Sequence, residues 1–187
     1  MIYMDISTIS KKYSIIYADP PWSYEVGKES GLMGIAESHY PTMTLEEIKK
    51  LPIQILGKDA VLFLWATFPK IETALEVMRN WGFEYRTVAF VWIKVSKEGR
   101  FLKSVGWWTR SNAEVCLLGV KGEHPKRKDN TVSQIVMASR REHSRKPDGV
   151  RDRIVQLMGD LPRIELFANQ AIEGWDVWSI GELQAGF

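Results

Sequence analysis

The chain has 187 residues, of which 45% are hydrophobic, and its formal net charge is +2. The hydrophobic share excludes a disordered chain, and the length suits one domain with a substantial core, which we expect to span residues 1–187. A single cysteine excludes an internal disulfide and a cysteine-based zinc cluster, and three scattered histidines have no metal-ligand spacing, so we expect no metal.

The first predicted element is a buried strand at residues 15–18, which ends at Asp19-Pro20-Pro21-Trp22. Neither proline can donate to a sheet ladder and each fixes its own φ, so the strand stops with a stiff backbone. Ligands of open α/β sheets bind outside the carboxyl ends of the strands, so we expect Asp19 to project into such a crevice. Asp5 and Ile6 precede this strand by about one loop and can reach the same crevice, although an ordinary surface acid explains Asp5 equally well.

The tetrapeptide combines two hydrogen-bond acceptors with an aromatic ring. The Asp19 carboxylate and the Pro20 carbonyl are held close together, and Trp22 adds a flat apolar face beside them. This set suits a planar ring with an exocyclic amino group, because the amino group donates twice and the ring stacks. An Asp-Pro pair alone is more typical of a rigid turn, and the complete tetrapeptide after an apolar strand favours a site.

The next elements alternate between strands and helices. Residues 23–41 form a long irregular segment with three glycines, which we interpret as a lid over the site. A capping box at residues 44–47 predicts a helix to about Leu51, and the apolar run 59–67 predicts a strand buried on both faces. A helix follows from Pro69 to Gly82, and then a strand at 88–93. This order predicts a parallel sheet with right-handed crossovers.

The C-terminal half repeats the alternation with two basic runs between its elements. We predict a second long loop at 95–110, a strand at 113–121, an edge strand within 131–138, a helix from Pro147 to Gly159, a strand with its exit at 163–169 and a last strand at 175–180. The basic runs are residues 126–128 and 140–146. There is no apolar signal core and no stretch long enough to span a membrane, so we expect a soluble intracellular protein.

Several motifs occur together in one order across residues 15–180. They are Asp19 to Trp22, Tyr40-Pro41, Leu62 to Trp65, Trp81-Gly82, Trp92 to Lys94, Glu114 with Leu118 to Gly122, Ser144 to Asp148, and Ile164 to Phe167. In this combination the chain resembles the MT-A group of S-adenosylmethionine (SAM)-dependent N6-adenine methyltransferases. That group is named for the catalytic subunit of the messenger-RNA adenosine methyltransferase and also has bacterial and phage members that act on DNA.

The resemblance implies a fold and a set of site residues. The fold is a Rossmann-like methyltransferase fold, a mostly parallel doubly wound α/β sheet in a circularly permuted motif order, with the catalytic strand first and the cofactor strand near the C-terminus. The implied catalytic residues are Asp19, Pro20, Pro21 and Trp22. The implied SAM-binding residues are Asp19, Lys146 and Glu165, and Asn169 and Gln170 stand at further cofactor positions of the family. We add Asp5, Ile6 and Phe167 to the expected SAM-binding residues. The chain departs from the messenger-RNA enzymes at Asn169-Gln170 and at residues 181–183.

The resemblance also implies a DNA adenine N6-methyltransferase that acts on a flipped-out base. Trp22 and Tyr40 are expected to grip the adenine, and the phosphates are assigned to Lys126, Arg127, Lys128, Arg140 and Arg141. The compact chain lacks RNA-binding appendages, which favours DNA. RNA adenosine methylation, an inactive nucleic-acid-binding subunit and methylation of a protein amide stay open, as does a homodimer. The expected location is the cytoplasm of a bacterial cell or of a phage-infected host, with no membrane partner.

Overall fold

A computed structural model describes residues 6–23, 43–102, 106, 108–140 and 145–180. Its helices are α1 (Leu45–Lys50), α2 (Ile71–Asn80) and α3 (Gly149–Met158), with short 3-10 turns at Ile6–Thr8, Ile53–Ile55 and Phe68–Lys70. Its strands are β1 (Ile15–Ala18), β2 (Ala60–Ala66), β3 (Glu84–Val95), β4 (Ala113–Lys121), β5 (Ile135–Ser139), β6 (Arg163–Leu166) and β7 (Asp176–Trp178). The elements predicted from the sequence are therefore present, with small differences in their bounds.

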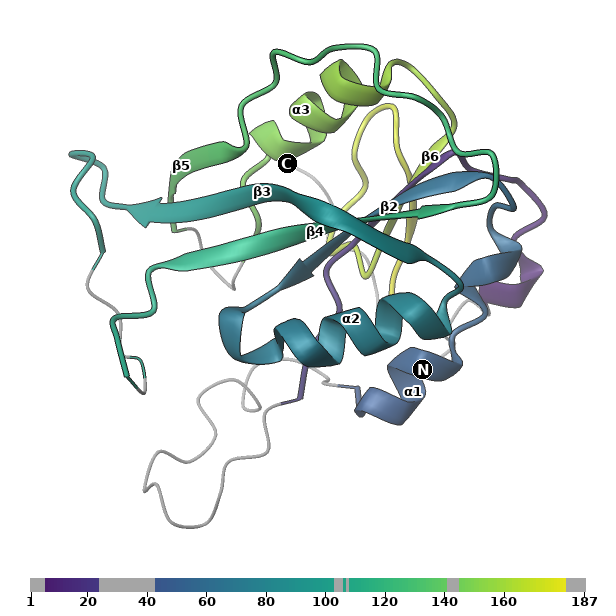
Figure 1. Cartoon of the computed structure of the whole chain (residues 1–187), viewed down its shortest axis with the longest axis horizontal. Helices are drawn as coiled ribbons and strands as arrows, with labels where there is room; N and C mark the ends of the chain where they lie inside the picture. The colour runs from purple at the N-terminus through teal and green to yellow at the C-terminus, as the bar shows by residue number, and fades with distance from the viewer. Residues whose placement is uncertain (1–5, 24–42, 103–105, 107, 141–144, 181–187) are drawn as a thin grey trace.

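The strands form one sheet in the order β5-β3-β4-β2-β1-β6-β7 (Figure 1). β1 pairs in parallel with β2 on one side and with β6 on the other, and β7 and β5 extend the sheet in parallel with β6 and β3. β4 is antiparallel to both β2 and β3 and lies between them. The mostly parallel sheet is confirmed, but nothing in the apolar run 113–121 predicted that this strand reverses.

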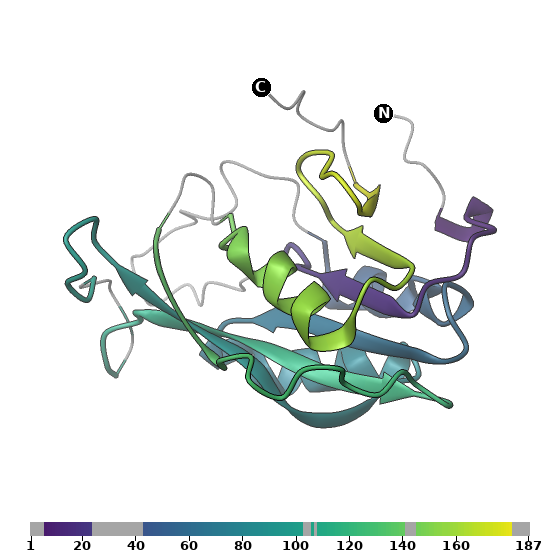
Figure 2. The same cartoon turned by 90° about the horizontal axis from the view of Figure 1, so that it is seen from above.

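Helices cover both faces of the sheet, as a doubly wound fold requires (Figures 1 and 2). Ile16 and Ala18 of β1 join the core that includes Ile48 of α1 and Val77 of α2. The alternate residues of the same strand join the core that includes Val150 and Ile154 of α3. Successive side chains of a strand point to opposite faces, so every residue of a strand buried on both faces must be apolar or paired.

Local sequence signals set the ends of the helices. Thr44 Oγ1 accepts from the backbone N–H of Glu47 at 3.3 Å, and the Glu47 carboxylate accepts from the N–H of Thr44 at 2.7 Å. This reciprocal pair satisfies two of the backbone donors that a helix start leaves without an intrahelical partner. After α2 the chain turns at Gly82, whose φ of 82° lies in the left-handed region that glycine tolerates best.

The sheet topology decides which loops share an edge. β1, β2, β3, β5, β6 and β7 all run in one direction, so their carboxyl ends meet at one edge of the sheet, which we call the carboxyl edge. β4 runs the other way and therefore ends at the opposite edge. Among the described helices, none is long and apolar enough to cross a membrane.

Trp81 links α1 and α2, the two helices on one face of the sheet. Its fully buried indole Nε1 donates to the carbonyl oxygen of Ile48 at 2.9 Å, which ties the end of α2 to α1. We expect Trp81→Phe to lower the free energy of unfolding by about 1–3 kcal/mol, because the donor is lost and ring volume with it. Urea denaturation measures the change. The matched control is Trp108→Phe, which alters a ring that is 99% exposed and should change stability by less than about 0.5 kcal/mol. Equal midpoints for the two variants would contradict this reading.

Candidate active site

The residues after β1 have a fixed backbone. The N–H of Trp22 donates to the Pro20 carbonyl at 2.8 Å, and the N–H of Met43 donates to the Pro21 carbonyl at 3.2 Å. A carbonyl oxygen has two lone pairs, so the Pro20 oxygen can accept a second bond. The Asp19 side chain stays 31% exposed, so its carboxylate is open to a ligand at the carboxyl edge. The two predicted acceptors are therefore adjacent and held in place.

The Trp22 ring lies elsewhere than the sequence analysis placed it. The side chain is only 8% exposed and belongs to the core on the α1 and α2 face, and its Nε1 donates to the Trp65 carbonyl at 3.1 Å. This leaves little of the ring for a ligand. The position indicates that Trp22 anchors the tetrapeptide to β2, and the stacking role stays a prediction without support from this geometry.

Lys146 connects Asp19 to a strand on the other side of β2. Its ammonium lies 2.7 Å from Asp19 Oδ2 and 3.2 Å from Glu114 Oε2, and Glu114 Oε1 accepts from Lys94 at 2.5 Å. Lys146, Glu114 and Asp19 come from the approach to α3, from β4 and from the end of β1. Sequence reasoning gave no role to Glu114 or Lys94. An acid inside a buried apolar strand was the available signal, because such a charge requires a partner.

The pKa values of this group depend on burial and on neighbouring charge. Burial raises the pKa of Asp19 above its ordinary value, and Lys146 only partly offsets this. Burial alone would lower the pKa of Lys146, but the Asp19 and Glu114 carboxylates raise it. Burial also opposes ionisation of Glu114, yet Lys146 and Lys94 hold its pKa below the usual range. The Asp19 and Glu114 carboxylates therefore stabilise the protonated form of Lys146, which lies between them.

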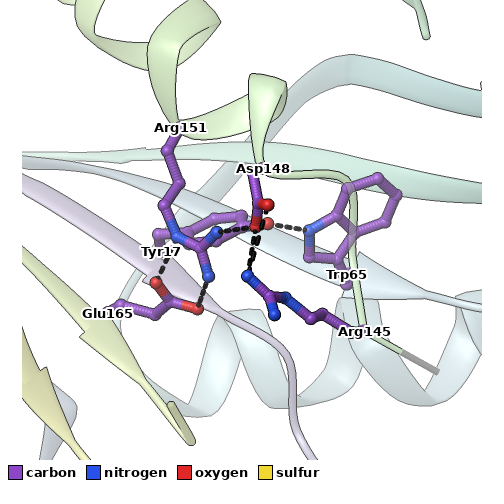
Figure 3. Close-up of polar contacts among 6 residues, drawn as sticks. All are labelled: Tyr17, Trp65, Arg145, Asp148, Arg151 and Glu165. Atoms are coloured by element: carbon purple, nitrogen blue, oxygen red, sulfur yellow. Dashed lines mark hydrogen bonds and ion pairs between the residues drawn. The ribbon is translucent and has the colours of Figure 1, made fainter. Parts of the chain in front are cut away.

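A second ion-pair cluster consists of Arg145, Asp148, Arg151 and Glu165 (Figure 3). Arg151 Nε donates to Glu165 Oε2 at 2.6 Å and its Nη2 donates to Glu165 Oε1 at 2.7 Å. Its Nη1 donates to Asp148 Oδ1 at 3.0 Å, and Arg145 donates to both oxygens of Asp148. Arg151 and Asp148 were not predicted as site residues. Arg151 lies on the sheet-facing stripe of α3, one turn before Ile154, and a charge on such a stripe is the signal that could have identified it.

Two aromatic rings separate the clusters. Tyr17 OH accepts from Trp65 Nε1 at 2.7 Å, and both rings are fully buried on the α3 face. The Lys146 ammonium lies 5.6 Å from the Trp65 ring centroid, and the Arg151 guanidinium carbon lies 5.8 Å from that of Tyr17. Each cation therefore has an aromatic face as well as carboxylate partners. Segment 145–151 is in this way fixed over the ends of β1, β2 and β6.

The exit of β6 lies at the same edge. Glu165 is paired in register with Tyr17, and Phe167 follows with a φ of 63°, a left-handed conformation that is uncommon for a bulky residue. The Phe167 ring packs edge-on against Trp178 at 5.3 Å between centroids. Asn169 and Gln170 come directly after this turn in the chain. The assignment of Glu165, Phe167, Asn169 and Gln170 to one binding region stays a prediction.

Other predicted site residues are distributed differently. The side chain of Ile6 is buried in the core on the α1 and α2 face. Arg140 is exposed directly after β5, at the carboxyl edge but four strands from β1. Asp5, Tyr40 and Arg141 lie outside the described residues, as does nearly all of the predicted lid at 23–41.

The basic run 126–128 lies away from Asp19. It follows β4, whose reversed direction delivers it to the opposite edge of the sheet, near the end of α3. There the N–H of Lys128 donates to the Leu157 carbonyl at 2.7 Å. The sequence analysis grouped these residues with the site because it had no sign that β4 is antiparallel. Their position does not support contact with phosphates that flank a base at Asp19.

Comparison with known proteins agrees with this geometry. The MT-A70 family matches residues 13–182 of the chain. The chain belongs to the MT-A70 family of methyltransferases. The resemblance drawn from the motifs is therefore confirmed over nearly the whole described fold, and with it the Rossmann-like methyltransferase class.

Similar proteins come from two groups. The chain is 36% identical to the Type II methyltransferase M.MunI of Mycoplasma sp, in an alignment that covers 91% of this chain and 78% of that protein. It is 32% identical to the human N(6)-adenosine-methyltransferase catalytic subunit METTL3, over 88% of this chain but only 27% of that protein. An MT-A70-like N(6)-adenosine-methyltransferase of Arabidopsis thaliana is 30% identical, with 23% of its length covered. The chain thus spans about a quarter of these longer relatives.

The residues at the carboxyl edge fit the cofactor that the family implies. Glu165 lies one residue before the end of β6, close to the place where an acid of a dinucleotide fold binds a ribose diol. Lys146 supplies a cation within reach of the same edge, suited to a carboxylate. The fit rests on the chemistry of these donor and acceptor groups.

The charge network predicts opposite titration shifts in two variants. We expect the Asp19 carboxyl to titrate above the ordinary aspartate value of about 3.9. Lys146→Met should raise the pKa of Asp19 further, since Lys146 lowers it, whereas Glu114→Gln should lower it, since Glu114 raises it. Carbon-13 NMR of the side-chain carboxyl, assigned with Asp19→Asn, measures both shifts. Shifts of the same sign in the two variants would show that the network does not control Asp19.

Proposed function

We propose that the chain is a DNA adenine N6-methyltransferase that uses SAM and acts on a flipped-out adenine. The observation that carries this proposal is the pairing of two acceptors, the Asp19 carboxylate and the Pro20 carbonyl, at the carboxyl end of β1 beside Glu165 of β6. Support for DNA comes from M.MunI, a Type II methyltransferase that aligns over most of both chains.

Asp19 and Pro20 act on the amino group of the base. The exocyclic nitrogen of adenine is a poor nucleophile because its lone pair is delocalised into the ring. The two acceptors accept hydrogen bonds from its two N–H groups and draw the nitrogen toward tetrahedral geometry, which localises the lone pair. Positive charge that develops on nitrogen then lies beside a carboxylate, so the stabilisation is greatest in the transition state.

Other residues bind and orient the cofactor. SAM, when bound, supplies an electrophilic methyl group on a sulfonium. We assign Glu165, with Asn169 and Gln170 after it, to the ribose of the cofactor, and Lys146 to its carboxylate. Asp5 and Ile6 keep the cofactor assignment that rests on their position shortly before β1. Lys146 contacts Asp19 directly, so one side chain borders both the cofactor and the reacting base.

RNA adenosine methylation is the second candidate. METTL3, which is named as an N(6)-adenosine-methyltransferase catalytic subunit, aligns with 88% of this chain, and this similarity favours RNA adenosine methylation. The inactive-subunit and protein-amide alternatives are weaker. An inactive protein has no chemical need for Asp19, and a protein amide does not explain the match to enzymes named for adenosine.

The test incubates purified protein and isotopically labelled SAM with separate DNA, RNA and protein substrates. Mass spectrometry of the nucleosides and peptides then locates the methyl group. We expect N6-methyladenine in DNA. Methylation only in RNA would transfer the assignment to the second candidate, and methylation only of cytosine or of protein would refute both.

Asp19→Asn tests the chemical role of the carboxylate. The amide keeps the shape of the side chain but removes the negative charge, so we expect kcat to fall about a hundredfold or more. The thermal unfolding transition should stay cooperative, because Asp19 keeps part of its surface in solvent. Single-turnover methylation measures the rate, and circular dichroism checks the fold. Near-normal turnover would exclude Asp19 from the chemistry.

The two basic regions predict different salt dependences. Arg140→Gln should reduce affinity for a short duplex and lower the slope of log K against log salt by about one, since one phosphate contact is lost. Neutralising Lys126, Arg127 and Lys128 together should leave that slope unchanged, because they lie at the opposite edge. Fluorescence anisotropy at several salt concentrations measures both slopes. A large fall for the triple variant would restore the phosphate role predicted from sequence.

A further inference from the structure

Arg151 is an arginine buried where α3 faces the sheet, with 8% of its surface exposed. Its neighbours on that face of α3, Val150 and Ile154, are fully buried and apolar. Burying a guanidinium is costly, and a well-packed apolar residue is often at least as stabilising at such a place. A role other than packing would therefore explain why an arginine occupies this position.

The guanidinium holds the Glu165 carboxylate at two points. Arg151 Nε and Nη2 donate to different oxygens, at 2.6 Å and 2.7 Å. This two-point contact stops the carboxylate from rotating and keeps a cation beside it. Each carboxylate oxygen has about two acceptor sites, and Arg151 uses one on each. Both oxygens therefore retain the capacity to accept one more hydrogen bond.

Arg151 is itself fixed from three sides. Its Nη1 donates to Asp148, which two hydrogen bonds from Arg145 hold in turn (Figure 3). Its guanidinium carbon lies 5.8 Å from the centre of the Tyr17 ring, the residue paired with Glu165 across β1 and β6. A carboxylate with a restrained partner is preorganised, so a ligand spends little free energy on orienting it.

We propose that Arg151 is a positioning residue, which fixes Glu165 so that its two oxygens accept from the two adjacent hydroxyls of the cofactor ribose. This inference rests on the proposed function, which assigns Glu165 to that ribose. A vicinal diol presents two neighbouring donors, and the fixed carboxylate presents two neighbouring acceptors. An analogue that lacks one hydroxyl leaves one acceptor site of the fixed carboxylate unfilled and forfeits a hydrogen bond to a charged group, so it should bind more weakly.

Calorimetry with S-adenosylhomocysteine and its 3′-deoxy analogue tests the proposal. The wild-type protein should bind the complete ligand at least about tenfold more tightly, the effect of one hydrogen bond to a charged group. Arg151→Met should bring this ratio close to one. Because an unpartnered buried carboxylate can prevent folding, Arg151→Lys is the second variant. It keeps the charge but cannot form the two-point contact, so the ratio should fall to about threefold or less.

Two controls separate positioning from general stability. Arg153→Met removes an arginine from the same helix that donates to the Ser133 and Ile135 carbonyls, and it should leave the ratio unchanged. In a Glu165→Gln background, Arg151→Lys should have almost no further effect on the ratio, since the two residues act as one unit.

Each outcome decides one claim. A full wild-type ratio in Arg151→Lys, or an equal loss of affinity for both ligands, would overturn the positioning role while leaving the proposed function intact. A wild-type protein that binds S-adenosylhomocysteine but shows no preference for it over the 3′-deoxy analogue would also overturn the positioning role. A wild-type protein that does not bind S-adenosylhomocysteine would overturn the proposed function and this inference with it.

Discussion

The ion pair between Lys146 and Asp19 joins parts of the chain that are 127 residues apart. A buried ammonium is stable only with anionic partners, and Lys146 finds them on Asp19 and on Glu114 of β4. Satisfying this one cation draws the turn before α3 onto the carboxyl edge of the sheet. The second cluster, from Arg145 to Glu165, follows from the same placement, because its basic residues lie on that turn and on the first turn of α3.

The two clusters divide the work at this edge. In the proposed function, Asp19 and the Pro20 carbonyl are the acceptors for the base, and Glu165, one strand away on β6, is the acceptor for the cofactor. Tyr17 and Trp65 are joined by a hydrogen bond, and each ring lies against the cation of one cluster. A methyl transfer needs two ligands held end to end, and neighbouring parallel strands supply two adjacent sets of acceptors with a fixed spacing.

Much of this arrangement follows from local sequence signals. The apolar run before Asp19, the capping box at Thr44 and the turn at Gly82 each have a short-range physical cause, and the structure contains all three. The ordered motifs were sufficient to identify the family and the strand that the candidate catalytic residues follow. The carboxyl-edge position of Asp19 then follows from the general behaviour of parallel sheets.

What the sequence did not predict depends on long-range pairing. An apolar run looks the same in either direction, so the reversal of β4 and the resulting position of residues 126–128 had no local signal. The local sequence does not decide whether the Trp22 ring is exposed or buried, because its hydrogen-bond partner, the Trp65 carbonyl, lies 43 residues away in the chain. The helix pattern predicts which positions of α3 are apolar and assigns no role to a charged residue among them. The role of Arg151 becomes apparent only from its contact with Glu165, which requires the folded structure.

The central claim is that Asp19 and the Pro20 carbonyl bind the amino group that is methylated. The most direct measurement is a crystal structure of the protein with S-adenosylhomocysteine and a DNA duplex that contains the target adenine. We predict a flipped adenine whose exocyclic nitrogen lies within hydrogen-bonding distance of both the Asp19 carboxylate and the Pro20 oxygen, with the ribose of the cofactor product at Glu165. An adenine bound with its amino group away from Asp19, or a cofactor product bound away from β6, would contradict the account.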